Sequence, residues 1–508
     1  MHKPPNILFF QVDQLMAHAL KCYGNTFCIS PNLDKLAENG VVFEQAYCNF
    51  PLCAPSRASM ATGQLCSAIG VYDNAAELPA QVPTYAHYLR DMGYQTILSG
   101  KMHFIGPDQF HGFEKRLTPD LYPADFAWVP NWGSEGKRDT NDARGVTISG
   151  VAARTVQMDF DENVTHAAKR ELYALAQSDD NRPFFMQVSW THPHEPFLCQ
   201  QEFWDLYEGV DIPPPKVGPL SGDRHDAHAV RTLSDFGMLD HLFSEDEIAR
   251  ARRAYYGSIS YIDGMVGELL DVLEKCGMAE NTAIVFTSDH GEMLGERGIW
   301  FKKHFYEDSL KIPLILNAPW CPSGRVAELA SLVDLLPTFC GLAQGSPWES
   351  SIEALEGTDL TQYIGSASGP SQRTIYAEYL AEATPAPIFM LRRDRFKFVW
   401  SEIDPPMLFD VHADPNELTN LAQDEAHKAV VEAFVVDVHA KWDVQALRDD
   451  ILASQKRRLL VKGAMEQGPG IRWNHNETPQ DNVPWYRGEG SYNDWAFAHL
   501  PVKVDPDL

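Results

Sequence analysis

Strand-length apolar runs that end in polar residues recur along most of the chain. They are NILFFQV at 6–12, GVVFEQAY at 40–47, YQTILSGK at 94–101, PFFMQVSW at 183–190, NTAIVFT at 281–287 and IPLILNAP at 312–319. Helix patterns separate these runs. Because the strands are apolar throughout and alternate with helices, we predict an α/β fold with a large, mainly parallel sheet sandwiched by helices.

The predicted helices carry recognisable end signals. Ser30 and Pro31 begin a helix that Gly40 ends, and residues 84–93 form a short helix. A long helix is predicted over 244–277, with a capping box at its first turn. These signals support the alternation of strands and helices.

The pattern changes near residue 372. Short strands are predicted at 373–379, 386–400 and 406–411, followed by one helix over 424–461, which together indicate a smaller antiparallel sheet plus helix. The tail from about 463 is rich in Trp and Tyr, so we expect it to pack against the protein. The predicted domains are a catalytic α/β domain (1–371), the small C-terminal domain (372–462) and an aromatic tail (463–508), a possible active-site lid or subunit contact.

Composition narrows the class of protein. The chain has 508 residues and a formal net charge of −28, which argues against a nucleic-acid binder, although a local positive pocket for a small anion is still possible. The apolar runs are too short to span a membrane, and the first residues do not resemble a signal peptide, so we expect a cytoplasmic protein. The nine cysteines include no C-x-x-C pair, which predicts reduced thiols and no structural zinc site.

Two of the predicted strands end in the same kind of residue pair. The first ends in Asp13 and Gln14, and the strand near 285 ends in Asp289 and His290. The carboxyl ends of parallel strands lie at one edge of the sheet, so these side chains can converge on one divalent cation. Oxygen-rich ligands favour Ca²⁺ or Mn²⁺, with Mg²⁺ possible. The two aspartates could instead be helix caps or turn formers.

Cationic side chains and histidines follow other strand ends. Arg57 lies four residues after Cys53, on the same face of a helix. The remaining candidates are Lys101, His103, His192, His194, Lys302, Lys303 and His304. Each alone has an ordinary structural explanation. Together, a metal ringed by cations and histidines is suited to hydrolysis of a tetrahedral oxyanion ester.

Four segments resemble one family. Cys53-Ala54-Pro55-Ser56-Arg57 matches the C-x-P-S-R signature of the type I, formylglycine-dependent sulfatases of the alkaline phosphatase superfamily. SGKMHF resembles their G-K-x-H signature, SDHGEMLGERG their metal-binding strand end, and HADPNELTNLA the segment before their C-terminal helix. VYDNAAE, LSGKMHFIGPDQFHGFE and DLYPADFAW look most like choline sulfatases. The VDQ and SDHG pair is shared in appearance with phosphonate monoester hydrolases.

The resemblance implies a role for Cys53. In the family, a formylglycine-generating enzyme oxidises this cysteine to Cα-formylglycine, whose hydrated gem-diol is the nucleophile. One hydroxyl attacks the sulfate and expels the alcohol. The other is then deprotonated, the aldehyde re-forms and inorganic sulfate leaves.

The resemblance also implies the roles of the surrounding residues. The metal shell would be Asp13, Gln14, the modified Cys53, Asp289 and His290. Arg57 would orient the formylglycine, Lys101 and Lys302 would bind sulfate oxygens, and His103 would be the base that collapses the hemiacetal. His194 would bind sulfate and, with Lys302, protonate the leaving group. Asn74 would contact the sulfate or the diol.

The alcohol is less determined than the chemistry. A choline pocket needs an aromatic face and a carboxylate, for which Trp128 and Glu378 are the candidates. The segment after Trp128 and the tail after 463 depart from choline sulfatases, so an aryl or other alkyl sulfate remains open. Two further functions also stay open: a phosphonate monoester or phosphodiester hydrolase, and a non-catalytic homologue that binds metal or anion. We expect a homo-oligomer, a dimer or tetramer.

Overall fold

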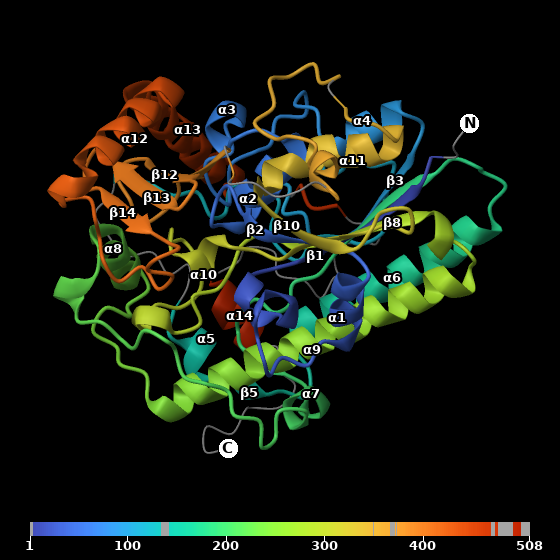
Figure 1. The fold of residues 1–508 in the computed structure, drawn as a ribbon, viewed down its shortest axis with the longest axis horizontal. Helices are drawn as coiled ribbons and strands as arrows, with labels where there is room; N and C mark the ends of the chain where they lie inside the picture. The colour runs from blue at the N-terminus through green and yellow to red at the C-terminus, as the bar shows by residue number, and fades with distance from the viewer. Residues whose placement is uncertain are drawn as a thin grey trace.

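Two sheets of unequal size organise the molecule (Figure 1). The structure is a computed structural model that describes residues 4–133, 142–348, 350–365, 371, 373–468, 473–475 and 491–498. Within these residues, the large sheet has eight strands in the order β10-β2-β9-β8-β1-β6-β3-β4, and a four-stranded sheet has the order β11-β12-β13-β14. A short parallel pair, β5 and β7, completes the strand pairing.

The strands of the large sheet match the apolar runs of the sequence. They are β1 (Asn6–Val12), β2 (Val41–Tyr47), β3 (Gln95–Gly100), β4 (Lys115–Arg116), β6 (Phe184–Ser189), β8 (Thr282–Ser288), β9 (Leu314–Asn317) and β10 (Gly324–Ser331), with β5 at Gly150–Val151 and β7 at Leu198–Cys199. Only β9 pairs antiparallel with its neighbours, β2 and β8. The predicted fold class, a mainly parallel sheet, is confirmed.

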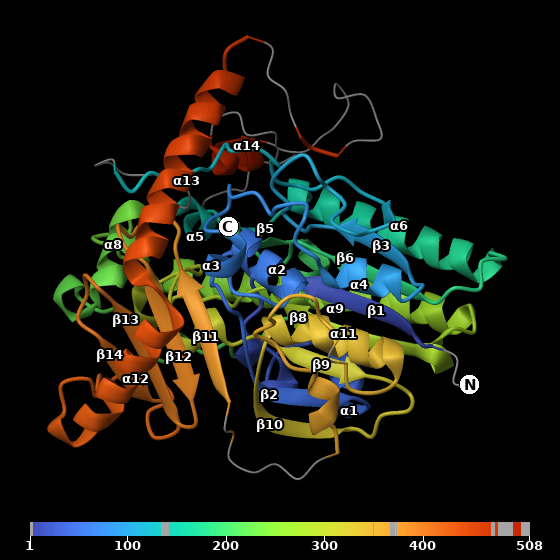
Figure 2. The ribbon, with the colours of Figure 1, turned by 90° about the horizontal axis from the view of Figure 1, so that it is seen from above.

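The two faces of the sheet bury two separate cores. Along β1, Ile7 and Phe9 belong to one core, and Leu8, Phe10 and Val12 to the other, as the alternation of side chains along a strand requires. Helices α2, α4 and α11 cover the first face, and α1, α6 and α9 the second (Figures 1 and 2). A continuous apolar strand sequence is therefore the consequence of helices on both sides.

The helices have the following bounds: α1 Pro31–Glu38, α2 Cys53–Thr62, α3 Cys66–Ile69, α4 Tyr85–Asp91, α5 Arg144–Thr147, α6 Val156–Gln177, α7 Gln201–Asp205, α8 Ala227–Asp235, α9 Glu245–Lys275, α10 Glu307–Leu310, α11 Leu335–Gln344, α12 Lys428–Lys441, α13 Val444–Met465 and α14 Tyr492–Ala498. The capping box predicted for the long helix α9 is present, because the side chains of Ser244 and Glu247 each accept the other's backbone N–H.

The C-terminal sheet consists of β11 (Thr374–Tyr379), β12 (Ile388–Arg393), β13 (Phe396–Ser401) and β14 (Met407–Asp410), all antiparallel as predicted. Helices α12 and α13 lie beside it (Figure 2). The predicted domain boundary falls just before β11. Residue 372 and much of the tail lie outside the described residues, so the domain limits stay a prediction.

The single helix predicted over 424–461 is wrong, because two helices, α12 and α13, occupy this region. The chain is extended at Trp442 (φ −124°, ψ 133°), whose ring stacks on Phe389 with centroids 4.2 Å apart. Asp443 then caps α13 by accepting the N–H of Ala446. Burial of the tryptophan against the small sheet thus interrupts a sequence that is otherwise favourable for one continuous helix.

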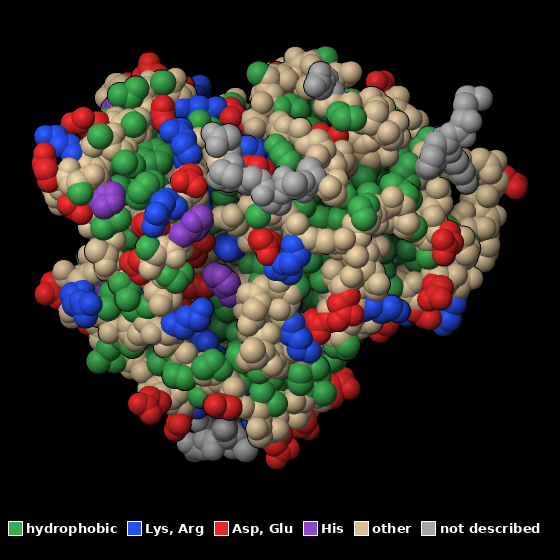
Figure 3. Space-filling view, in the orientation of Figure 1, with side chains coloured by type: hydrophobic (Ala, Val, Ile, Leu, Met, Phe, Trp, Pro, Cys, Tyr) green, Lys and Arg blue, Asp and Glu red, His purple; other side chains and the backbone are tan. Residues whose placement is uncertain are grey.

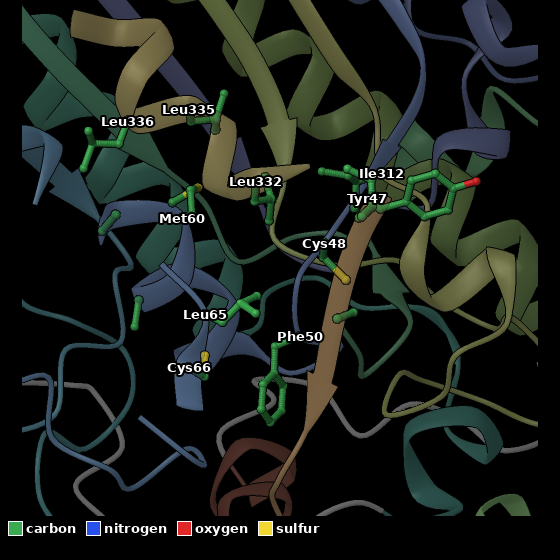
Figure 4. Close-up of a cluster of buried hydrophobic side chains, with 14 of the residues drawn as sticks. Tyr47, Cys48, Phe50, Met60, Leu65, Cys66, Ile312, Leu332, Leu335 and Leu336 are labelled. Carbon is green, nitrogen blue, oxygen red and sulfur yellow. The ribbon is translucent and has the colours of Figure 1, made fainter. Parts of the chain in front are cut away.

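Helix α2 is buried along its whole length. Figure 4 shows Met60 of α2 beside Leu335 and Leu336 of α11 in a buried apolar cluster. A fully buried helix of mostly small residues holds its first residue, Cys53, in a fixed position.

On the outer surface, acidic, basic and apolar side chains are mixed over the face that Figure 3 shows, in keeping with the absence of a basic nucleic-acid footprint there.

Candidate active site

The ends of β1 and β8 bring the predicted metal ligands together. Asp13, Cys53, Asp289 and His290 are all buried, and one potential ligand atom from each lies within 4.8 Å of the others. The register explains this convergence, since Val12 pairs with Ser288 and each strand is followed directly by its aspartate. The predicted proximity of these residues across the sheet edge is therefore present in the structure.

His290 has its free nitrogen directed at this cluster. Its Nδ1 lies 3.1 Å from the carbonyl oxygen of Gly291, which assigns the proton to Nδ1. The lone pair of Nε2 then faces Cys53 Sγ at 3.2 Å and one carboxylate oxygen each of Asp13 and Asp289 at 3.7 Å. Burial lowers the pKa of His290 despite these carboxylates, so the ring is a neutral, ligand-ready imidazole.

Two buried carboxylates orient the side chain of Gln14. Its Nε2 donates to Glu195 Oε2 at 2.6 Å and also to Glu292. Because the carboxylate of Glu195 accepts and the ammonium of Lys302 donates to the opposite atom of the amide, these contacts fix which end of the amide is nitrogen. The amide oxygen accepts from Lys302 Nζ. Sequence reasoning missed Glu195 and Glu292, although they lie within the segments THPHEPF and SDHGEML.

The two carboxylates differ in protonation. Burial raises the pKa of Glu195, but His194 and Lys302 more than offset this and leave the pKa below its usual value. Burial and the negative charge of Glu195 raise the pKa of Glu292 to about 7. One proton shared near Gln14 reduces the repulsion between two carboxylates that contact the same amide nitrogen.

Arg57 connects the two strand ends to Cys53. It lies one helical turn after Cys53 and is fully buried. Its Nε donates to Asp289 at 2.8 Å and its Nη2 to Asp13 at 3.1 Å, while Nη1 donates to the carbonyl of Lys101 and to Ser189 Oγ. Four acceptors on separate elements match the planar fork of a guanidinium, which a lysine could not reproduce.

Lys101 adds a second cation at the same carboxylate. Its Nζ forms an ion pair with Asp13 and lies 4.1 Å from the centroid of the Tyr122 ring. Burial would raise the pKa of Asp13, but Lys101, His194 and Arg57 hold it well below its usual value. Asp13 is therefore ionised and available as a ligand.

Lys302 and His194 form a hydrogen-bonded dyad. Lys302 Nζ donates to His194 Nε2 at 2.7 Å, and His194 Nδ1 lies 2.7 Å from the carbonyl of Glu195, which makes Nδ1 the protonated nitrogen. Burial would lower the pKa of Lys302, but Glu195 raises it above its usual value, so the ammonium is retained. The dyad holds a proton that can be passed through the imidazole.

His103 is buried, and among the described residues neither of its ring nitrogens has a hydrogen-bond partner. Its ring packs on Tyr122 and Trp128, with centroids 5.0 and 5.7 Å away. Burial, with the charge of Lys101, lowers its pKa to about 3. Unsatisfied buried polar atoms are costly in a folded protein, so this ring points to a ligand that supplies the missing partner.

A pocket of about 140 Å³ opens onto Cys53. Of the predicted site residues, it is lined by Cys53, Asn74, His103, Trp128, His194 and Lys302. Asn74 accepts the N–H of Ala54 at 3.0 Å, so it also fixes the first turn of α2. Lys303, one of the weaker sequence candidates, also lines the pocket. Residues that sequence reasoning did not single out complete the lining: Leu52, Tyr122, Glu195, Glu382, Ser491, Tyr492 and Asn493.

Glu378 does not line this pocket. It is fully buried on β11, where it accepts hydrogen bonds from Ser67 and from Trp442 Nε1, the latter at 2.6 Å. The glutamate of this segment that lines the pocket is Glu382, four residues further along the chain. The sequence AEYLAEA offers both glutamates, and only the end of β11 at Tyr379 decides between them.

Two of the weaker candidates also lie apart from the pocket. His192 contacts Asp161 at 2.6 Å, and His304 packs against His228 with ring centroids 5.5 Å apart. Neither lines the pocket around Cys53. These contacts agree with a structural role for both histidines.

Comparison with known proteins agrees with the geometry. Residues 5–346 match the sulfatase family, and residues 295–442 match the C-terminal region of N-sulphoglucosamine sulphohydrolase. The chain belongs to the sulfatase family. The predicted family and the prediction of an enzyme, a sulfuric ester hydrolase, are thereby confirmed.

Individual relatives cover nearly the whole chain. The sulfatase is 42% identical to a choline-sulfatase of Rhizobium meliloti (strain 1021), with 93% of each chain covered. It is 29% identical to an arylsulfatase of Clostridium perfringens, covering 84% of this chain and 92% of that one. The crystal structure of a phosphonate monoester hydrolase of Agrobacterium radiobacter shares the fold, with a TM-score of 0.70, 23% identity, and 88% and 96% coverage.

Among the described residues, no helix of this sulfatase combines the length and the apolar character needed to cross a membrane.

Proposed function

We propose that this sulfatase hydrolyses the sulfate monoester of a small alkyl or aryl alcohol, using a formylglycine made from Cys53. One observation carries the proposal. Cys53 begins α2 with its Sγ 3.2 Å from His290 Nε2 and 3.8 Å from Asp13 Oδ1, inside a cluster that Arg57 holds together. A nucleophile is thus positioned against a candidate cation site at the floor of a pocket.

The residues at the strand ends fit a divalent cation. Asp13, Asp289 and His290 offer two carboxylates and a neutral imidazole. Gln14 follows Asp13 directly, and its amide oxygen accepts from Lys302. This set suits Ca²⁺, Mn²⁺ or Mg²⁺. When bound, the cation would supply positive charge for the sulfate oxygens and acidify the hydrate of formylglycine, which is the nucleophile.

The chain's own residues supply the remaining functions. Arg57 forms ion pairs with Asp13 and Asp289 and holds both aligned with the first turn of α2. The Lys302–His194 dyad can bind a sulfate oxygen and deliver a proton to the departing alcohol oxygen. His103 is neutral and can accept a proton. The negative charge of a bound sulfate would raise its pKa and strengthen it as a base.

The mass of the tryptic peptide that contains Cys53 tests the proposal. Active protein, produced in a host with a formylglycine-generating enzyme, should contain the aldehyde in place of the thiol. Hydrolysis of 4-nitrophenyl sulfate should follow the modified fraction. A fully alkylatable thiol in active protein would refute the nucleophile, and modified protein without sulfatase activity would favour a non-catalytic homologue.

Phosphoryl transfer is the second candidate function. Gln14 and His290 in the metal shell resemble phosphonate monoester hydrolases, and one such enzyme shares the fold. Rates on 4-nitrophenyl sulfate, a matched phosphate diester and a matched phenylphosphonate distinguish the two. We expect the sulfate to have the highest kcat/KM, and a preference for the phosphonate would reverse the assignment.

The proposal also covers the identity of the alcohol, the role of the C-terminal tail and the oligomeric state. The name of the Rhizobium relative makes choline sulfate one of the first esters to test, and Trp128 in the pocket is compatible with it. We infer that the tail is a lid, because Ser491, Tyr492 and Asn493 line the pocket. The homo-oligomer, the maturation enzyme and the cytoplasmic location remain predictions.

A further inference from the structure

The pocket has two chemically distinct ends. Under the proposed function, the sulfate would lie among Cys53, His103, His194 and Lys302. At the other end, which we call the alcohol end, the lining consists of Tyr122, Trp128, Lys303, Glu382, Ser491, Tyr492 and Asn493. The reacting bond lies between the two, so the alcohol end contacts the group that distinguishes one sulfate ester from another.

The alcohol end contains a buried ion pair. Lys303 Nζ lies 2.8 Å from Glu382 Oε1, and the two side chains are only 1% and 7% exposed. The ammonium also lies 4.5 Å from the centroid of the Phe236 ring, and the backbone N–H of Lys303 donates to the carbonyl of Pro51. These contacts hold the lysine at the pocket wall.

Such a pair contributes little to stability by itself. Two buried charges lose their hydration, and well-packed apolar residues in their place are often equally stable or more so. An ion pair at the wall of a substrate pocket therefore has a more direct explanation in recognition.

A quaternary ammonium is poorly matched to this wall. It has no N–H to donate and no lone pair to accept with. It is attracted by Glu382 and repelled by Lys303 over nearly the same distance, so its net electrostatic gain is small while its desolvation cost remains. Aromatic rings alone would favour such a cation, but the lysine offsets their effect.

A hydroxyl group matches both members of the pair. It can donate to the carboxylate of Glu382 and accept from the ammonium of Lys303 at the same time. The rings of Tyr122, Trp128 and Tyr492, in contact with one another at centroid separations of 5.2 to 6.5 Å, provide an apolar wall for the carbon skeleton. Hydroxyls on an otherwise apolar frame are the defining chemistry of polyols and sugars.

We propose that the alcohol is a neutral polyol or sugar, and that the Lys303–Glu382 pair selects it over a quaternary ammonium alcohol such as choline. This proposal rests on the proposed function for the position of the sulfate, and it adds the class of alcohol.

Binding to the full-length Cys53→Ala variant tests the proposal independently of turnover. Calorimetry would compare glycerol sulfate, glucose 6-sulfate and choline sulfate, with 4-nitrophenyl sulfate as a ligand that lacks both hydroxyls and cation. We expect at least one of the two hydroxylated esters to bind tenfold or more tightly than choline sulfate. If choline sulfate binds more tightly than glycerol sulfate and glucose 6-sulfate, the proposal is wrong.

A second substitution tests the lysine itself. Lys303→Met in the same background should weaken the hydroxylated ester at least fivefold and strengthen choline sulfate at least tenfold, with less than a twofold change for 4-nitrophenyl sulfate. An unchanged ratio between the affinities for the hydroxylated ester and for choline sulfate would show that Lys303 does not select between them. Lys441→Met, which removes a half-buried lysine from an ion pair outside the pocket, is the matched control.

Two further measurements keep the outcomes separate. If Lys303→Met does not fold because Glu382 is left unpaired, the double variant Lys303→Met with Glu382→Gln removes both charges, and we expect it to lose the preference for hydroxylated esters. Hydrolysis of 4-nitrophenyl sulfate by mature protein tests the proposed function alone. A mature protein that binds as expected but hydrolyses none of the four esters would refute the proposed function and leave the proposal on the alcohol supported.

Discussion

The sulfate end and the alcohol end of the pocket are built in different ways. At the sulfate end, ligands follow directly on β1 and β8, and Cys53 begins a helix buried along its length. At the alcohol end, loops near 122–128, 303 and 382 and the first turn of α14 meet. Under the two proposals, sheet geometry would fix the chemistry and loops would set the choice of substrate, so that one could change without the other.

The two ends of the pocket also differ in how their charged groups are connected. Asp13 accepts hydrogen bonds from both Arg57 and Lys101, and Arg57 also donates to Asp289. The sulfate end is therefore a connected network in which charged groups share partners. The alcohol end has one ion pair set among aromatic rings. We therefore expect substitutions at the sulfate end to abolish turnover or metal binding, and those at the alcohol end to redistribute affinity among esters.

The largest effect is expected for Cys53→Ala. Turnover of every sulfate ester should fall by about 10⁴-fold or more, because the nucleophile is lost. Affinity for the preferred ester, measured by calorimetry, should change by less than about threefold, because the alcohol end is untouched. Residual turnover above a hundredth of the original rate would contradict the assignment of Cys53 as the nucleophile.

Arg57→Lys should be nearly as severe and should also affect folding. Lysine cannot bridge Asp13, Asp289, Ser189 and a backbone carbonyl, so we expect kcat to fall about 10²-fold or more and the free energy of unfolding to fall by about 3 kcal/mol. Denaturant unfolding and steady-state kinetics measure the two. Arg373→Lys, which disturbs a buried pair with Asp334 outside the pocket, should lower stability without this loss of kcat.

Glu292→Gln should weaken metal binding by about 10- to 100-fold, the usual effect of removing a group that orients a ligand. A glutamine at position 292 can present either its oxygen or its nitrogen to Gln14, so it no longer fixes the amide, which can then turn its nitrogen toward the cation site. Calorimetric titration of the metal-free protein with Mn²⁺ or Ca²⁺ gives the affinity. Glu296→Gln, in the same loop but bonded to backbone N–H groups, should bind metal normally, and equal affinities would disprove the orienting role.

We predict that the burial of His103 makes the free energy of unfolding depend on pH. Burial, with the charges of Lys101 and Arg57, lowers its pKa to about 3, while Asp120 and Asp13 oppose this shift. The unfolded chain binds a proton near pH 6.5 and the folded protein does not, so stability is lost as the pH falls below about 6.5. His103→Gln should remove about 2 kcal/mol of this loss between pH 7 and pH 5, measured by thermal or denaturant unfolding. Identical slopes would show that the ring is not held neutral.

The smallest effects are expected at the tail. Tyr492→Ala removes an aromatic contact with Tyr122 and should raise KM about fivefold with kcat unchanged, in line with about 1 kcal/mol for such a contact. Arg144→Ala breaks an exposed ion pair between α5 and α14 and should change KM less than about twofold. If both variants behave like the original protein, α14 is not a lid over the substrate.

The sequence by itself predicted the family of this protein and the chemistry proposed for it. Apolar runs ending in Asp13 and Asp289 predicted a common sheet edge, because parallel strands share a direction, and the C-x-P-S-R segment identified Cys53 and Arg57 within a recognisable family. These features are local in sequence, so a motif contains the residues and their spacing together. The motifs alone predict the metal ligands, the nucleophile and the arginine, and the folded protein places these residues within contact of one another.

Only the tertiary structure decided the alcohol end. It moved the pocket carboxylate from Glu378 to Glu382, paired the latter with Lys303, and brought Tyr492 from the far end of the chain beside Tyr122. It also divided the C-terminal helix at Trp442, whose indole N–H donates to Glu378. No short-range pattern encodes these contacts, because each joins segments tens to hundreds of residues apart, and their side chains acquire partners only when the two cores have packed.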